Sequence, residues 1–132
     1  MTAHLNVPPP KMIEREFRFR YRAELAHQSI EQINAFAKFA ETRGAKVFSS
    51  HPPLPREIFE PHRAELELLE ATLRSDLNTP ILEHIEEMTF PINDFFETYY
   101  HLAGPGVDKR SALLAERMAR QAGAAGPGRP PQ

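Results

Sequence analysis

The sequence has no cysteine among its 132 residues. This absence excludes disulfide bonds, thiolate metal sites and cysteine nucleophiles together. There is also no run of about 20 apolar residues, the length that a membrane-spanning helix requires. The polar start Met1-Thr2-Ala3-His4 lacks the apolar core of a signal peptide. We therefore expect a cytoplasmic protein without a membrane partner.

Motifs that carry catalysis are missing as well. The sequence contains no glycine-rich phosphate loop, no His-Glu-x-x-His motif and no serine in a nucleophile elbow. Gly104-Pro105-Gly106 is not followed by the Lys-Ser or Lys-Thr pair that phosphate binding needs. Few glycines precede the C-terminal tail, so a pocket with convergent backbone donors is difficult to build. We expect no enzyme activity and no cofactor.

The composition is that of a globular protein, with 41% hydrophobic and 26% charged residues. A chain of 132 residues fits one domain with a single core. The net charge of −2 hides an uneven distribution, because residues 51–102 carry 11 acids against three bases, whereas both flanking regions have a surplus of bases. Nucleic acid affinity depends on neutralising phosphates, so only the two ends of the chain are candidates for an RNA surface.

Hydrophobic periodicity predicts helices through most of the chain. Apolar residues step by three and four through residues 11–43, which predicts a long first helix that ends near Gly44. The alternation over residues 17–22 also fits a strand, but no second strand signal offers it a partner, so we favour the helix. Three prolines and two serines predict a loop over residues 46–55.

Proline and cap residues predict the helices that follow. Pro61 suits the first turn of a second helix, which runs to about Ser75. Thr79 as N-cap and Pro80 at the first helical position predict a third helix. Asp108 caps a last helix, which we expect to begin after a break at residues 104–107 and to reach about Gln121.

The densest aromatic cluster follows Pro91. Five residues there recur at the spacing that places side chains on one face of a helix: Ile92, Phe95, Phe96, Tyr99 and Leu102. We predict that this aromatic stripe is the centre of the core. The expected fold class is an all-α bundle of four to five helices. The expected domain organisation is a disordered arm at 1–10, a single helical domain at 11–121 and a disordered tail at 122–132.

The order of the residues also carries a resemblance. Pro-Ile-Asn-Asp-Phe-Phe-Glu at 91–97, followed by Arg-Ser-Ala-Leu-Leu-Ala at 110–115, resembles the end of the helical anticodon-binding domain of the bacterial glycyl-tRNA synthetase β subunit. Asp-Leu-Asn-Thr-Pro at 76–80 resembles the helix start in the related, DALR-like domain of cysteinyl-tRNA synthetases. The resemblance covers about residues 33–120. It implies a noncatalytic tRNA-binding module, free-standing or acting with a separate synthetase subunit.

Pairs of histidine and glutamate raise the alternative of a metal site in the bundle. His62 with Glu65, His84 with Glu87, and Glu97 with His101 each share a helical face in the predicted helices. Carboxylate-bridged di-iron sites place glutamate three residues before histidine, and these pairs have the reverse order or a spacing of four. We therefore expect no metal.

The resemblance implies tRNA contacts, and the surplus of positive charge places them in the predicted first and last helices; we expect no contact with DNA. Residues 15–22 alternate arginines, which anchor phosphates, with aromatics that stack on bases; the same run also fits a helix with its aromatics inward. A protein-interaction or accessory subunit, including a homo-oligomer, is the alternative function, because the same cations also suit an acidic protein partner. The predicted RNA-binding residues are Arg15, Arg18, Arg20, Arg22, Lys109, Arg110, Arg117 and Arg120.

Overall fold

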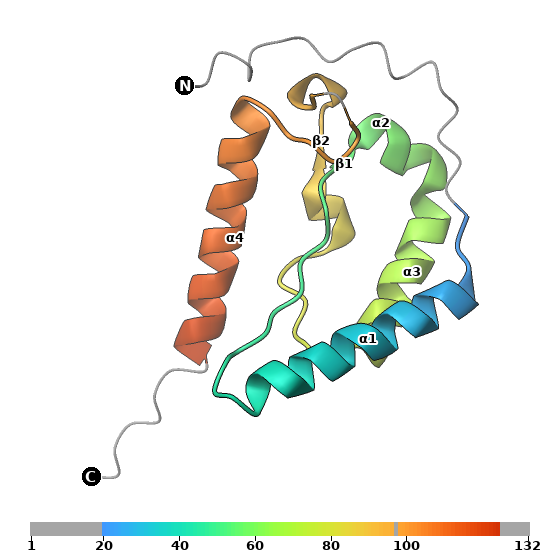
Figure 1. Ribbon diagram of the computed structural model, residues 1–132. Coiled ribbons are helices and arrows are strands. Elements are labelled where there is room, and N and C mark those ends of the chain that lie inside the picture. Colours follow the sequence, from blue (N-terminus) through green and yellow to red (C-terminus); the bar gives the residue numbers. More distant parts are fainter. Residues whose placement is uncertain (1–19, 97, 125–132) are drawn as a thin grey trace.

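The structure is a computed structural model that describes residues 20–96 and 98–124 (Figure 1). The predicted arm at 1–10, the first part of the predicted first helix, and residues 125–132 of the predicted tail lie outside these ranges. The helices are α1 (Ala23–Glu41), α2 (Arg56–Phe59), α3 (Arg63–Asp76) and α4 (Pro105–Ala124), with 3-10 helices at Glu60–His62, Ile85–Met88 and Ile92–Asp94, and the strands are β1 (Leu54–Pro55) and β2 (Thr89–Phe90).

The fold is mostly helical, as the sequence predicts, but a bundle of four to five helices describes it only approximately. Among the described residues, the three long helices are α1, α3 and α4, with 19, 14 and 20 residues, and β1 pairs with β2 in a small parallel sheet. An isolated parallel bridge joins Ser49 to Ile81 upstream of that sheet. The predicted loop before α2 therefore runs as an extended segment beside residues 81–90, through the middle of the molecule (Figure 1).

The end of α1 confirms the predicted stop at Gly44. Gly44 has φ of 86°, a left-handed conformation that glycine adopts without a Cβ clash. The Ala45 N–H donates to the Ala40 carbonyl at 3.2 Å, and the Gly44 N–H donates to the Glu41 carbonyl at 3.0 Å. This is the bond pattern of a Schellman motif. At its start, α1 differs from the prediction, because Arg22 has extended backbone and the helix begins at Ala23.

The predicted second helix is confirmed as α3, which ends at Asp76 and buries Leu66. The predicted third helix is wrong. Residues 80–84 are mostly extended, because the Leu82 N–H donates to the Ser49 carbonyl at 2.9 Å, and helix follows only as the 3-10 turn at Ile85–Met88. The backbone hydrogen bonds that a helix would supply are made to a distant segment instead.

The predicted aromatic helix after Pro91 is also wrong. A single 3-10 turn ends at Asp94, and the chain then doubles back, so that Phe95 forms an antiparallel bridge with Leu102. The Phe96 N–H donates to the His101 carbonyl at 2.7 Å. Phe95 is 3% exposed and belongs to the core, but Phe96 is only partly buried. The five residues of the predicted stripe therefore share no helical face.

Helix α4 starts earlier and ends later than predicted. Pro105 occupies its first turn, where a missing N–H needs no partner, so the predicted break is confirmed at Gly104 and wrong at residues 105–107, which are helical. Gly106 allows this start to approach the preceding loop, since a Cβ there would lie 2.8 Å from Leu102 Cδ2. The helix continues to Ala124, which corrects the first residues of the predicted tail.

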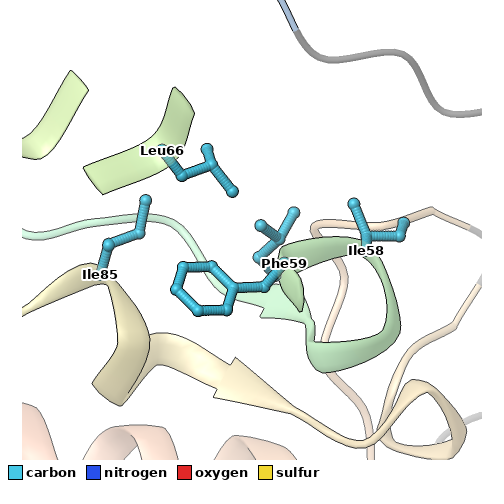
Figure 2. Packing of buried hydrophobic residues seen from close by; sticks show 5 residues of the cluster. Ile58, Phe59, Leu66 and Ile85 are labelled. Atoms are coloured by element: carbon cyan, nitrogen blue, oxygen red, sulfur yellow. The ribbon is translucent and has the colours of Figure 1, made fainter. Parts of the chain in front are cut away.

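Two apolar clusters form the core. The first contains Leu54, Ile58, Phe59, Leu66 and Ile85, with Phe59 fully buried among residues from β1, α2 and α3 (Figure 2). The second contains Met88, Phe90 and Phe95, and Leu102, Leu113 and Leu114 pack against it. Helix α4 is thus held by the second cluster. No residue of α1 belongs to either cluster, although Ile30 and Ala37 are buried.

Candidate functional sites

The predicted RNA-binding residues of α4 are mostly engaged within the molecule. Lys109 Nζ lies 3.8 Å from Asp94 Oδ2, Arg117 pairs with Glu87, and Arg120 pairs with Glu116. Arg110 is the exception: it is partly buried, and its Nε lacks a hydrogen-bond partner among the described residues. Three of the four predicted contacts on this helix therefore have their charge compensated by a carboxylate.

The predicted residues near α1 form a separate group. Arg15 and Arg18 lie outside the described residues, whereas Arg20 and Arg22 are exposed in the extended segment before α1. In Figure 1, this blue start of α1 lies on the opposite side of the molecule from α4. The structure therefore does not gather the described members of the two groups on one surface.

Arg110 borders a small pocket beside the start of α4. The pocket has a volume of about 230 Å³. Its lining mixes apolar side chains with groups that can donate hydrogen bonds: Pro53, Tyr100, His101, Leu102, Val107, Arg110 and Ser111. A small anion would find donors here, and Arg110 is the predicted RNA-binding residue of α4 best placed to meet one.

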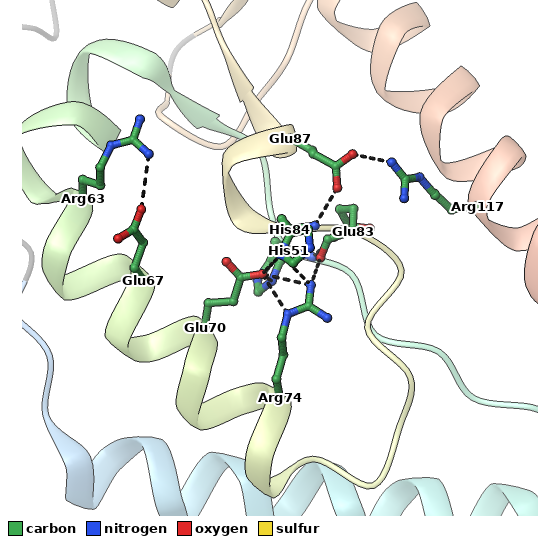
Figure 3. A network of polar contacts seen from close by, with 9 residues as sticks. All are labelled: His51, Arg63, Glu67, Glu70, Arg74, Glu83, His84, Glu87 and Arg117. Atoms are coloured by element: carbon green, nitrogen blue, oxygen red, sulfur yellow. Dashed lines mark hydrogen bonds and ion pairs between the residues drawn. The ribbon is translucent and has the colours of Figure 1, made fainter.

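A polar network joins the buried side chains of His51, Glu70 and Glu83 to the exposed Arg74, and sequence reasoning missed it (Figure 3). Glu70 on α3 accepts hydrogen bonds from Arg74 Nε at 3.0 Å and Nη2 at 2.9 Å. Arg74 Nη2 also donates to the Glu83 carbonyl at 2.8 Å, and the His51 N–H donates to Glu83 Oε1 at 2.6 Å. Only the Glu70–Arg74 spacing of four is visible in the sequence, because His51 and Glu83 lie on other segments.

The environment of this network shifts two pKa values. Burial lowers the pKa of His51, because desolvation of its charged form outweighs the attraction of Glu70 and Glu83. Burial acts to raise the pKa of Glu70, but the hydrogen bond from Arg74 and a backbone hydrogen bond from Ile85 together hold it below the ordinary value. The carboxylate Glu70 is therefore ionised and His51 is neutral near pH 7.

The network continues towards α4. His84 Nδ1 lies 3.0 Å from Glu70 Oε1, and the His84 N–H donates to Glu87 Oε2 at 2.8 Å. Glu87 in turn pairs with Arg117 of α4. In the described part of the chain, no group of three or more histidine and acidic side chains is placed to hold a metal ion. The network links α3 to α4, but His51 Nε2 and Glu83 Oε2 are buried without a hydrogen-bond partner among the described residues.

A different kind of surface lies along α1. Four large apolar residues on this helix are exposed: Leu25 at 51%, Ile33 at 37%, Phe36 at 61% and Phe39 at 55%. The Arg43 guanidinium lies over the Phe39 ring, 3.6 Å from its centroid, and leaves the ring exposed. We call Leu25, Phe36 and Phe39, which lie within about 60° of one another around the helix axis, the α1 face.

The α1 face adjoins an apolar groove. Ile33 and Phe36 form one wall, residues 47–52 form another, and Leu73, Leu77 and Ile81 complete it. The volume of the groove is about 390 Å³, and its described polar lining consists of Ser49, Ser50 and the buried His51. A helix that shows two phenylalanines beside such a groove has apolar area that residues 20–96 and 98–124 leave uncovered.

Comparisons with protein-family models, with curated proteins and with solved structures found no match. The resemblance to anticodon-binding domains therefore stays a prediction. No described helix is long and apolar enough to cross a membrane.

Proposed function

We propose that this protein is a noncatalytic, cytoplasmic interaction subunit whose α1 face and adjoining groove are covered by a protein partner. The observation that carries the proposal is the exposure of Phe36 and Phe39, at 61% and 55%, on a helix that also lines an apolar groove. Contiguous apolar patches beside a groove are typical of binding sites, whereas single exposed apolar residues are not.

The dimensions of the α1 face suit an amphipathic helix. Leu25 and Phe39 are 14 positions apart, which corresponds to a stripe of about 21 Å along the helix axis. An apolar helix laid along this stripe would cover all three residues of the face and extend over the groove. The hydrogen bonds and ion pairs of the polar network join α3 to residues 83–87 and to α4, so we assign that network a structural role.

Binding of tRNA remains a second proposal, and it rests on fewer residues than the sequence suggests. Arg20, Arg22 and Arg110 have no ion-pair partner among the described residues, whereas the remaining α4 cations do. Replacing Arg20 and Arg22 with glutamine should reduce the salt dependence of tRNA binding by about one phosphate equivalent for each true contact. Arg120→Gln is the matched control. If the wild-type chain binds no tRNA at low salt, this second proposal fails.

The main proposal is tested by photo-crosslinking. A benzophenone amino acid placed at Phe36 should crosslink in cells to a defined protein, and the product should show one discrete mass shift. The same amino acid at Ala115, an exposed position on α4, is the control and should not give this product. Equal crosslinking from both positions, or a product that contains only RNA, would contradict a protein-binding α1 face.

A further inference from the structure

We propose that the partner of the α1 face is the α1 face of a second copy, and that the two helices pair in antiparallel orientation. This inference rests on the proposed function and names its partner. It draws on two features of α1: the arrangement of its exposed residues about Gln32, and the arrangement of its charges.

Two exposed apolar residues of α1 are symmetric about Gln32, and Phe36 would lie opposite Gln28. Leu25 lies seven positions before it and Phe39 seven positions after it. In an antiparallel pair centred at Gln32, Leu25 of one copy therefore meets Phe39 of the other, and this contact occurs twice. Ser29 and Ala35 are exposed, lie three positions on either side of the centre, and are small enough to let the two helices approach closely.

The charges beside the α1 face repeat every seven positions. Glu24, Glu31 and Lys38 share one flank of the helix. In the antiparallel pair centred at Gln32, Glu24 of each copy lies about 3 Å along the axis from the level of Lys38 of the other. This is within reach of the two long side chains and gives two attractive contacts, and one contact between the two Glu31 residues remains repulsive. In a parallel pair this flank of one copy would lie against the opposite flank of the other, so Glu24 and Lys38 would not meet. The charge order therefore favours the antiparallel arrangement.

These charges have no partner in the described part of the molecule. No ion pair involves Glu24, Glu31 or Lys38, in contrast to the cations of α3 and α4, where Arg63, Arg74 and Arg117 all pair with carboxylates. An unrelated apolar helix would also cover Phe36, but it would have to carry a matching order of charges. A second copy carries the same charges, and the antiparallel arrangement brings Glu24 of each copy near Lys38 of the other.

The first test is sedimentation equilibrium of the full chain over a range of concentrations. The wild-type chain should reach twice the monomer mass. Phe36→Glu should weaken association on the order of 100-fold, because each dimer buries the new charge twice. Tyr100→Glu, at a residue that is 52% exposed in the segment between β2 and α4, should leave association unchanged. That segment lies at the far end of the molecule from α1 (Figure 1).

The second test is a charge exchange that reports on orientation. Glu24→Lys and Lys38→Glu should each weaken the dimer about tenfold, since each turns two attractive contacts into repulsive ones. The double variant should restore most of the wild-type affinity. Circular dichroism should be unchanged in the single and double variants, because Glu24 and Lys38 are both exposed.

Three results would overturn the inference: a monomer at every concentration, a dimer insensitive to Phe36→Glu, or a double variant as weak as the singles. A monomer that still crosslinks from position 36 to a different protein would overturn the self-pairing and leave the proposed function standing. A monomer that crosslinks to no protein would overturn both.

Discussion

Helices α1 and α4 have nearly the same length, 19 and 20 residues, but they are attached to the molecule in different ways. Helix α4 packs Leu113 and Leu114 against the second apolar cluster, and Lys109 and Arg117 reach carboxylates of other segments. Helix α1 buries only Ile30 and Ala37, and its polar side chains Asn34 and His27 contact Asp76 at the end of α3. The difference teaches that an amphipathic helix of a given length can serve either as part of the core or as a surface for a partner.

Polar contacts define the attachment of α1. Asn34 Nδ2 donates to the Asp76 carbonyl at 2.9 Å, and Asn34 Oδ1 accepts from the Asn78 N–H at 2.8 Å. Nearer the start of the helix, the Tyr21 hydroxyl lies 3.0 Å from the Thr72 hydroxyl. Such contacts orient a helix well but bury little apolar area, so α1 can present its remaining face to another molecule.

The largest expected effect comes from the core under α4. Phe95→Ala should lower the free energy of unfolding by about 3 to 5 kcal/mol, because it empties a buried aromatic site. Phe36→Ala should change it by less than about 1 kcal/mol in dilute solution, where no partner is present. Urea denaturation of both variants measures the difference. Equal losses would mean that the α1 face is covered within the chain.

A smaller and local effect is expected at Asn34. Asn34→Ala removes both hydrogen bonds to the end of α3 and should cost about 1 to 2 kcal/mol. Amide exchange should become faster in α1, while exchange in α4 stays at the wild-type rate. Asn34→Asp is the matched variant, since it keeps an acceptor for Asn78 and loses only the donor. Faster exchange in both helices would show that they do not dock independently.

Acidification should have the smallest effect, and it acts on the polar network between the helices. The pKa of His51 is lowered in the folded state, so as the pH falls below about 6.5 the unfolded chain takes up the proton first and stability decreases. The loss is at most about 1.4 kcal/mol for each pH unit. Glu70 has a lowered pKa as well, and it adds a further loss below about pH 4.5.

Urea denaturation at pH 7.5 and pH 5.5 tests the contribution of His51. The His51→Gln variant should lose less stability between these two pH values than the wild-type chain does. If both lose the same amount, the pH dependence arises at another group.

The parts of the fold that follow from local patterns were predictable. The end of α1 at Gly44, the course of α3 and the body of α4 depend on periodicity and caps, which the sequence displays directly. The segments around Leu82 and Phe95 also have helical spacing, yet their backbone groups bond to residues 49 and 101–103. Such long-range pairings override local preference and leave no periodic signal.

In the candidate sites too, the residue types could be predicted from the sequence, but the contacts that they make in the fold could not. The basic residues of α4 were visible as a charge surplus, but their pairing with Asp94, Glu87 and Glu116 depends on the folded arrangement. The apolar residues of α1 were correctly placed in a helix, and which of them remain exposed follows only from how α1 meets α3. His51 and Glu83 stand out in neither composition nor spacing, because they meet through backbone segments that are distant in sequence.

The pairing of β1 with β2 determines when the helices can dock during synthesis. Leu54 pairs with Thr89, so the centre of the molecule is closed only after the chain has passed that residue. Helix α1 is complete at Glu41, about 35 residues before α3, the helix on which it docks, ends at Asp76. At a translation rate of about 5 to 20 residues per second, this interval lasts roughly 2 to 7 seconds. During this interval Asn34 of α1 lacks the Asp76 carbonyl to which it donates in the folded chain.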